Sequence, residues 1–226
     1  MKRLISIGEA LIDFVPHQVG CELKEVKDFK GVVGGAPANV SGAYIKLGGP
    51  AAMITQLGQD AFGDRIVDEF IGHGIDVSHI LRTDEANTCL AFVSLKEDGN
   101  RDFSFYRKPS ADMLMSPDVV QKEWFEDAYA LHFCSLCLGN FPMKEAHRKA
   151  ISYALECGDM ISFDPNIRLP LWKDYNELRK AILEFIPYAH VLKISDEELE
   201  FITGCTKVED AKDILFQGNV QLVVYT

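Results

Sequence analysis

The sequence predicts an α/β fold: an open, mostly parallel β-sheet flanked by helices, with a small second sheet attached. From about residue 129, apolar runs typical of strands recur at intervals of 29 to 31 residues, centred on Phe133, Phe163, Leu192 and Val223. Helical patterns fill the gaps, at about 142–157, 174–186 and 197–216. Successive βα units of this length imply parallel strands joined by right-handed crossovers. A hairpin pattern at 88–107 lies outside this rhythm and predicts the second sheet.

The composition is that of an ordinary globular chain. Its 226 residues can bury one substantial core, and 47% of them are hydrophobic and 25% charged. The net charge of −11 argues against a nucleic-acid partner, which needs a basic face. Only a few apolar residues follow Met1 before Glu9, so we predict no signal peptide, no membrane span and a cytoplasmic location.

The six cysteines follow no disulfide framework spacing; they stand at positions 21, 89, 134, 137, 157 and 205. Four of them lie in apolar or strand-like runs, which favours buried free thiols. Cys134 and Cys137, with His132 nearby, leave a metal or redox site open as an alternative, although no second ligand pair accompanies them.

Residues 4–15 predict a first strand, nearly all apolar, as expected for a parallel strand covered on both faces. Glu9 and Asp13 interrupt this run. A carboxylate there is expensive to bury unless something donates a hydrogen bond to it. Asp13 is therefore either a surface residue at the strand's end or a ligand-binding group.

The glycine-rich stretch 31–49 predicts a sharp turn followed by a helix. Gly34 and Gly35 give the backbone room for a close approach by a ligand, and Pro37 fits a first helical turn. The helix should bury the stripe Val40, Ala43, Tyr44 and Leu47. Asn39 lies beside the free N–H groups of the helix start, an arrangement that suits a neutral polyhydroxyl ligand. A plain turn with a helix cap is the alternative, and neither common nucleotide-loop motif is matched.

A second helix is expected after Asp60, which is a plausible N-cap residue. Phe62, Ile66 and Phe70 would form its buried stripe, so we interpret this segment as structural.

The hairpin has a strand at about 88–95, a tight turn at 97–100 and a return strand at 101–107. Side chains alternate on the return strand, with Phe103, Phe105 and Arg107 on one face and Asp102, Ser104 and Tyr106 on the other. Apolar residues on both faces require cover on both, which favours a lid over a site on one side and a partner subunit on the other. An ordinary core hairpin is the alternative.

Ligands of an open α/β sheet bind beyond the carboxyl ends of its strands. After the strand at 160–163 comes the stretch 164–172, where Asp164 and Arg168 are held in a loop because Pro165 and Pro170 prevent a regular helix. After the strand at 190–194 come Lys193, Ser195 and Glu198. Capping by Ser195 and the helix dipole explain the acidic run nearly as well as a catalytic role would.

Several of these stretches together resemble the PfkB (ribokinase-like) family of carbohydrate kinases, and among them the fructokinases. The motifs are Gly8-Glu-Ala-Leu-Ile-Asp13-Phe, the Gly34-Gly35 stretch with Asn39, Phe105-Tyr-Arg-Lys-Pro-Ser-Ala-Asp112, Phe163-Asp-Pro-Asn-Ile-Arg-Leu-Pro-Leu-Trp172 and Lys193-Ile-Ser-Asp-Glu-Glu198. Matches run from Ile5 to Thr226. The resemblance implies one ribokinase-like domain over 1–226, with lid segments at about 14–33 and 88–107, and a homodimer formed through the lid.

The resemblance also implies roles for individual residues. Those expected to bind the sugar are Asp13, Gly34, Gly35, Asn39, Phe105, Tyr106, Arg107 and Asp164. Those expected near ATP are Arg168, Lys193, Ser195 and Glu198, with Arg168 stabilising the transferred phosphate and Glu198 organising Mg²⁺ indirectly. Ser195 replaces the Asn of the family's Asn-x-x-Glu motif, as is usual for fructokinases.

One family motif is missing from these residues. Members carry a Gly-Ala-Gly-Asp segment whose aspartate deprotonates the sugar hydroxyl, and no such segment occurs within residues 1–226. We therefore expect a domain incomplete at its C-terminus that is inactive alone. The implied function is an ATP-dependent fructokinase. The alternatives are another PfkB kinase, for 2-keto-3-deoxygluconate, ribose or a riboside, and a non-catalytic sugar-binding protein. A dinucleotide-binding enzyme is disfavoured because no glycine fingerprint follows any strand.

Overall fold

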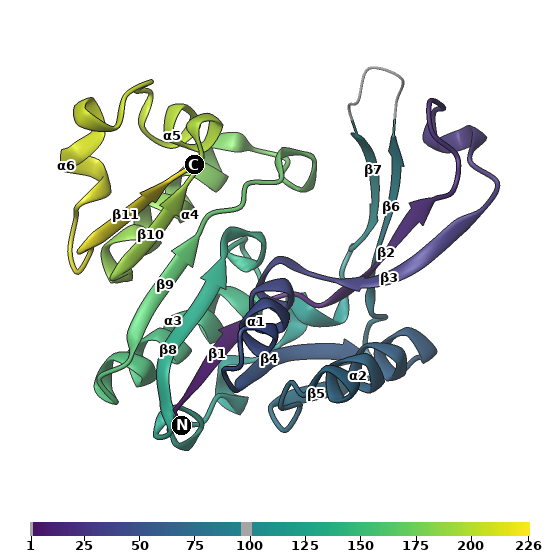
Figure 1. The fold of residues 1–226 in the computed structure, drawn as a ribbon, viewed down its shortest axis with the longest axis horizontal. Coiled ribbons are helices and arrows are strands. Elements are labelled where there is room, and N and C mark those ends of the chain that lie inside the picture. Colours follow the sequence, from purple (N-terminus) through teal and green to yellow (C-terminus); the bar gives the residue numbers. More distant parts are fainter. Residues whose placement is uncertain (1, 96–100) are drawn as a thin grey trace.

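The computed structural model describes the chain except residues 1 and 96–100, and it contains the two predicted sheets (Figure 1). The larger sheet has seven strands in the order β11-β10-β9-β8-β1-β4-β5, and every neighbouring pair is parallel. The smaller has four strands in the order β3-β2-β6-β7 and projects beyond one end of the larger sheet. The predicted α/β class with an open parallel sheet and a small lid sheet is confirmed.

The strands of the larger sheet are β1 (Arg3–Ile7), β4 (Ala51–Gly58), β5 (Ile80–Thr83), β8 (Ala128–Cys134), β9 (Met160–Asp164), β10 (Val191–Ile194) and β11 (Leu222–Tyr225). The α-helices are α1 (Ala36–Lys46), α2 (Ala61–His73), α3 (Pro142–Glu156), α4 (Tyr175–Phe185), α5 (Asp196–Thr203) and α6 (Lys212–Leu215). Single 3₁₀ turns lie between them: η1 (Leu23–Glu25), η2 (Ala111–Leu114), η3 (Pro117–Val119), η4 (Lys122–Phe125), η5 (Ser135–Cys137), η6 (Leu169–Leu171), η7 (Ile186–Tyr188) and η8 (Val208–Ala211). The regular βα alternation after residue 129 is as predicted.

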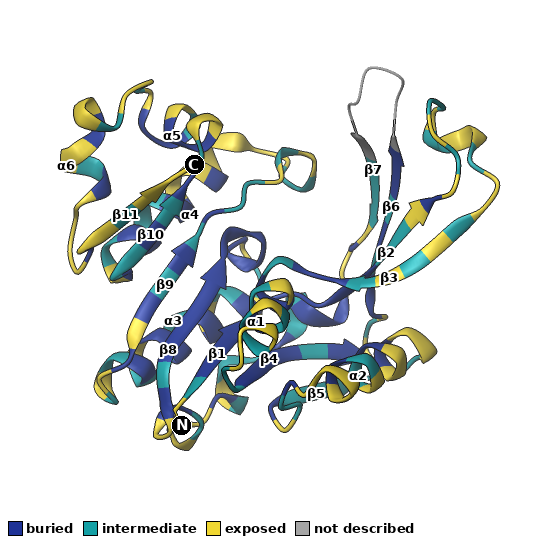
Figure 2. Cartoon of the chain, in the orientation of Figure 1, coloured by how far each residue is buried: buried dark blue, intermediate teal, exposed yellow. Residues whose placement is uncertain are grey.

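Helices cover both faces of the larger sheet, so nearly all residues of its central strands β8, β1 and β4 are buried (Figure 2). Side chains alternate along β1: Leu4 packs toward α1, whereas Ile5 and Ile7 join the main core cluster with α3 and α4. That cluster includes a stacked pair, Phe133 and Phe163, whose ring centroids are 4.4 Å apart. None of the helices in the described part of the chain could span a membrane.

Residues 4–15 form two strands instead of the single strand predicted. The chain leaves the larger sheet after β1, turns through Gly8, Glu9 and Ala10, and enters the lid sheet as β2 (Leu11–Pro16). The Oε1 atom of Glu9 accepts a hydrogen bond from the backbone N–H of Ala36 at 2.9 Å. This bond ties the turn to the start of α1, a long-range contact that hydrophobic patterning does not reveal.

The lid sheet consists of β2, β3 (Phe29–Gly34), β6 (Cys89–Leu95) and β7 (Arg101–Tyr106). β6 and β7 pair antiparallel, as predicted, and the tight turn expected at 97–100 lies outside the described residues. β2 lies at the centre of the sheet, antiparallel to β3 and parallel to β6. The lid therefore connects directly to the start of α1 through β3.

Two helix predictions need correction. The buried residues of α1 are Pro37, Ala38 and Ser41, whereas Leu47 is 85% exposed. The helix packs closely on β1 through small side chains, and the Ser41 hydroxyl donates to that of Ser6 at 2.9 Å. The predicted helix at 197–216 is divided, because the left-handed backbone of Gly204 ends α5.

The predicted start of α2 is confirmed. The Oδ1 atom of Asp60 accepts hydrogen bonds from the backbone N–H groups of Phe62 and Gly63. Ile66 and Phe70 are buried as predicted, but Phe62 is 36% exposed and packs edge-on against Phe14 of the lid.

Candidate functional site

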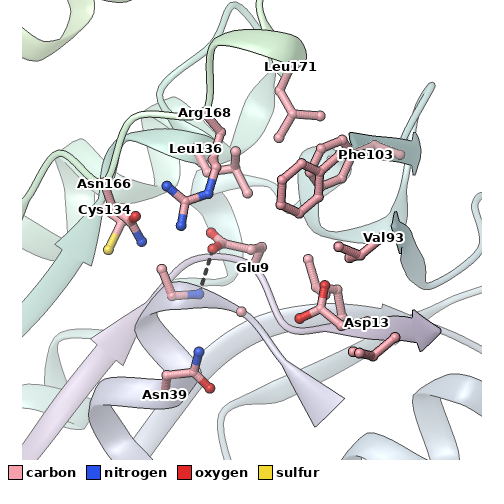
Figure 3. Close-up of a pocket in the computed structure, with 15 residues that line it drawn as sticks. Glu9, Asp13, Asn39, Val93, Phe103, Cys134, Leu136, Asn166, Arg168 and Leu171 are labelled. Carbon is pink, nitrogen blue, oxygen red and sulfur yellow. Dashed lines mark hydrogen bonds between the residues drawn. The ribbon is translucent and has the colours of Figure 1, made fainter. Parts of the chain in front are cut away.

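A cavity of about 380 Å³ lies where the lid sheet meets the carboxyl end of the larger sheet (Figure 3). Residues from β2, α1, β6, β7, the end of β8 and the loop after β9 line it: Glu9, Leu11, Asp13, Val15, Gly35, Ala36, Asn39, Val93, Phe103, Phe105, Cys134, Leu136, Asn166, Arg168 and Leu171. This is the end of an α/β sheet at which ligands bind.

Polar groups from four segments converge on this cavity. Figure 3 shows Glu9, Asp13, Asn39, Asn166 and Arg168 around a common space, with apolar side chains of the lid on one side. Two carboxylates, two amides and one guanidinium can together donate to and accept from several hydroxyl groups. The cavity can therefore hold a small polyhydroxyl molecule in one orientation.

Asp13 lies on β2 facing the cavity. Burial raises the pKa of its carboxyl, and the positive charge of Arg168 works against that increase. Part of the Gly-Gly turn is shaped around this side chain, because a Cβ atom at Gly34 would lie 2.3 Å from the Asp13 Oδ2 atom. Gly35 has a φ of 114°, and a Cβ there would lie 2.4 Å from the carbonyl oxygen of Glu9. A side chain at Gly35 would collide with the backbone of Glu9, and one at Gly34 would displace the Asp13 carboxylate.

Asn39 stands in the first turn of α1, on the exposed side of the helix, and borders the cavity. Its backbone N–H donates to the carbonyl of Gly35 at 2.9 Å, so the helix is already regular there. The Asn39 backbone is thus held at a fixed position relative to the Gly-Gly turn.

A second cavity of about 440 Å³ adjoins the first. The two share Phe103, Phe105, Asn166 and Arg168, and the second adds Lys193, Ser195, Glu197, Glu198 and Phe201 among others. Arg168 therefore lies at the boundary between a cavity rich in hydroxyl-binding groups and a cavity with a second cation.

Glu198 joins two segments that line the second cavity, the loop after β9 and the start of α5. Its Oε1 atom accepts from the backbone N–H of Ile167 at 2.9 Å, and its Oε2 atom accepts from that of Ser195 at 2.9 Å. The Ser195 hydroxyl in turn accepts from the N–H of Glu198, so the capping interpretation is confirmed. The same carboxylate thus caps α5 and holds the loop that carries Arg168.

Lys193 at the end of β10 reaches toward two acids. Its Nζ atom is 3.4 Å from Asp164 Oδ1 and 3.8 Å from Glu198 Oε2. Burial raises the pKa of Asp164, and Lys193 opposes the increase. Asp164, predicted to bind the sugar, is absent from the lining of both cavities and pairs with Lys193 instead.

The lid residues are placed differently from the prediction. Phe105 lines the cavity as predicted, stacked on Phe103 with centroids 5.6 Å apart. Tyr106 points to the opposite face, where it is 64% exposed, because neighbouring residues of a strand alternate. Arg107 is buried, with its Nη2 atom 2.6 Å from Asp112 Oδ2. Neither Tyr106 nor Arg107 lines the cavity. The lid residues that line it together with Phe105 are Phe103 and Val93.

Two polar cavity residues were missed by sequence reasoning. Glu9 is 2% exposed, and its position within an apolar run was the available signal. Asn166 has a φ of 44°, and its N–H donates to Asp164 Oδ1 at 3.1 Å. The Asp-Pro-Asn sequence is a turn signal, and this turn directs Asn166 into both cavities.

The cysteines form no disulfide. Cys134 Sγ lies 3.7 Å from His132 Nε2, and burial lowers the pKa of His132 to about 4. The described residues contain no cluster of three or more His, Cys, Asp or Glu side chains that could hold a metal ion, so the alternative of a metal site at these cysteines gains no support.

Comparisons with known proteins agree with this geometry. Residues 1–226 match the pfkB family of carbohydrate kinases. The chain is 43% identical over 224 residues to "Probable fructokinase-4" of Arabidopsis thaliana, covering 99% of this chain and 69% of that protein. The crystal structure of fructokinase from Xylella fastidiosa superposes with a TM-score of 0.90 at 34% identity, covering 100% of this chain and 73% of that one. The structure of fructokinase from Xylella fastidiosa with bound ATP gives a TM-score of 0.90 at 35% identity, covering 99% and 68%.

Proposed function

The chain belongs to the PfkB family of carbohydrate kinases, and on that premise we propose that the protein functions as an ATP-dependent fructokinase. The reaction is transfer of the γ-phosphate of MgATP to a hydroxyl of D-fructose. The observation that carries the proposal is the pair of adjoining cavities, one rich in hydroxyl-binding groups and one lined by Lys193 and two glutamates, with Arg168 bordering both.

In this proposal the first cavity holds the sugar. The Asp13 carboxylate accepts hydrogen bonds from sugar hydroxyls, and the amides of Asn39 and Asn166 donate and accept. Phe103 and Phe105 cover the sugar from the lid and exclude water from one side. Fructose is favoured among sugars because the named relatives are fructokinases.

The second cavity fits a nucleotide's phosphates and their Mg²⁺, because it brings two cations and two carboxylates together. Arg168 and Lys193 would bind phosphate oxygens and stabilise the charge that develops during transfer. Glu198 would act on Mg²⁺ indirectly, by fixing the loop and the start of α5. Bound Mg²⁺ neutralises phosphate charge. Residues 1–226 contain no Gly-Ala-Gly-Asp segment, so no residue described here is assigned as the base.

A sugar panel tests the substrate. We expect ATP-dependent phosphorylation of fructose by an enzyme that carries this domain together with a Gly-Ala-Gly-Asp base, with specificity constants for ribose, a riboside and 2-keto-3-deoxygluconate at least tenfold lower. Residues 1–226 alone should bind fructose without phosphorylating it. A preference for one of those sugars would be consistent with the family assignment but would contradict fructose as the substrate. Because activity requires a base, direct binding of each sugar by calorimetry accompanies the kinetic assay and separates failed binding from failed chemistry.

The lid further supports a homodimer as part of this proposal. One face of the lid carries an aromatic cluster that leaves Tyr106 64% exposed beside Phe92, with ring centroids 5.4 Å apart. A second copy covering this face would bury that surface. Light scattering should give twice the chain mass for the unmodified protein and a single chain mass for Tyr106→Lys. A monomer at high concentration in both would contradict the dimer.

A further inference from the structure

The roles proposed above leave Glu9 without a function, although it is the most buried carboxylate of the sugar cavity. It is 2% exposed, against an intermediate exposure for Asp13. A carboxylate this deep is expensive unless its oxygens find partners. Such a residue in a cavity calls for an explanation beyond stability.

The partners of Glu9 lie on opposite sides of the site. Its Oε1 atom accepts from the Ala36 N–H at the first residue of α1 (dashed in Figure 3). Its Oε2 atom lies 3.7 Å from the Cys137 thiol, which is also 3.6 Å from Asp112 Oδ2. Asp112 forms the buried ion pair with Arg107, which directly follows β7 of the lid. Glu9 therefore stands between the helix that carries Asn39 and the base of the lid.

We propose, on the basis of the function proposed above, that Glu9 is a positioning residue: it holds the first turn of α1 in the sugar cavity and couples it, through Cys137, to the Arg107–Asp112 pair beneath the lid. The charged carboxylate makes the stronger bond to the Ala36 N–H, because ionised acceptors form stronger hydrogen bonds than neutral ones. Loss of that charge therefore loosens the Gly35–Asn39 segment.

Burial gives this contact a pH dependence. It raises the pKa of Glu9 to about 7, although the Ala36 N–H and the charge of Arg107 oppose the increase and Asp112 adds to it. The other groups facing Glu9 are the thiols of Cys89, Cys134 and Cys137, whose pKa values burial raises, so they stay neutral in this range. Asp13 and Arg168 face it across the cavity. Sugar affinity should thus rise as the pH increases through about 7.

Stability must change in the opposite direction. A carboxyl whose pKa is raised in the folded state stabilises that state while protonated and destabilises it once ionised. Above pH 7, Glu9→Gln should therefore melt at a higher temperature than the unmodified protein, yet bind sugar more weakly. A residue with a purely structural role would not separate these two quantities.

The test is fructose binding by calorimetry from pH 5.5 to 8.5, with melting temperatures measured in parallel. For the unmodified protein we expect affinity to increase several-fold across pH 7. Glu9→Gln should show no such increase, about tenfold weaker binding at pH 8 and a raised melting temperature. Glu9→Ala, which removes the acceptor altogether, should bind more weakly still.

Asp159 supplies a matched control. It is 3% exposed at the start of β9, at the opposite end of the sheet, and burial raises its pKa as well. Asp159→Asn should also melt higher at pH 8 but keep the unmodified affinity and pH profile. Equal affinity of Glu9→Gln and the unmodified protein at pH 8 would overturn the inference.

The Ala36 amide reports on the contact without any sugar. Its proton resonance should titrate with a midpoint near pH 7, and the titration should vanish in Glu9→Gln. A resonance that does not titrate would overturn the inference whatever the sugar data show. A titrating resonance together with no fructose binding at any pH would overturn the proposed function and, with it, the sugar-positioning role.

Discussion

At the scale of single residues, the site depends on two carboxyl groups whose charged forms are destabilised by burial. Asp13 and Glu9 both line one small cavity, and burial raises the pKa of each. The charge of Arg168 offsets part of this cost for Asp13, and the Ala36 N–H and the charge of Arg107 do so for Glu9. The structure therefore keeps acceptors for hydroxyl groups at the expense of stability, as binding sites commonly do.

Asp13→Asn should weaken fructose binding without unfolding the protein. A hydrogen bond to a charged group contributes about 1.5–3 kcal/mol, which corresponds to roughly 10- to 150-fold in affinity. The amide has nearly the same shape, and removal of a partly buried charge relieves its desolvation. Calorimetry measures the loss, and unchanged fructose affinity would remove Asp13 from the site.

Arg107→Ala should destabilise the fold itself. Arg107 is 9% exposed, and its loss leaves the carboxylate of Asp112, 1% exposed, without its cation. Breaking a buried pair from one side costs about 3–5 kcal/mol. Urea denaturation measures this loss. The double variant Arg107→Ala/Asp112→Ala should recover part of it, and a single variant as stable as the unmodified protein would contradict the ion-pair account.

At the scale of elements, strand alternation and helix caps decide which side chains reach the site. Phe103 and Phe105 face the cavity because they share one face of β7, whereas Tyr106 cannot. The loop after β9 carries Asn166 and Arg168, and Glu198 fixes it through the N–H of Ile167. The Glu198 carboxylate therefore links the cap of α5 to the conformation of this loop.

Ser195→Ala tests that link. Loss of an N-cap hydroxyl costs about 1 kcal/mol, within a range of roughly 0.5–2. Because the capping box also orients Glu198, ATP affinity should fall together with stability. Ser152→Ala, on the exposed side of α3, is the control and should change stability by less than about 0.5 kcal/mol. An unchanged ATP affinity in Ser195→Ala would contradict the claim that the cap of α5 shapes the second cavity.

At the scale of the whole molecule, sequence pattern predicts the sheet but not the contacts that cross it. The strands β8 to β11 follow from apolar periodicity, and Asp60 and Ser195 follow from local capping rules. The turn that divides residues 4–15 is joined to the start of α1 by the hydrogen bond between Glu9 and Ala36, 27 positions apart. Arg107 and Asp112 are only five positions apart, but strand alternation groups Arg107 with Phe105 and does not predict the ion pair that buries it.

The most direct test of the account is to locate fructose on the protein by NMR. Titration with D-fructose at pH 8 should shift the amide resonances of Asp13, Gly35, Asn39 and Asn166 together, with one dissociation constant. Residues at the opposite end of the sheet, such as Asp159, should not move. Shifts confined to another surface, or no shifts at saturating sugar, would contradict the assignment of this cavity as the sugar site.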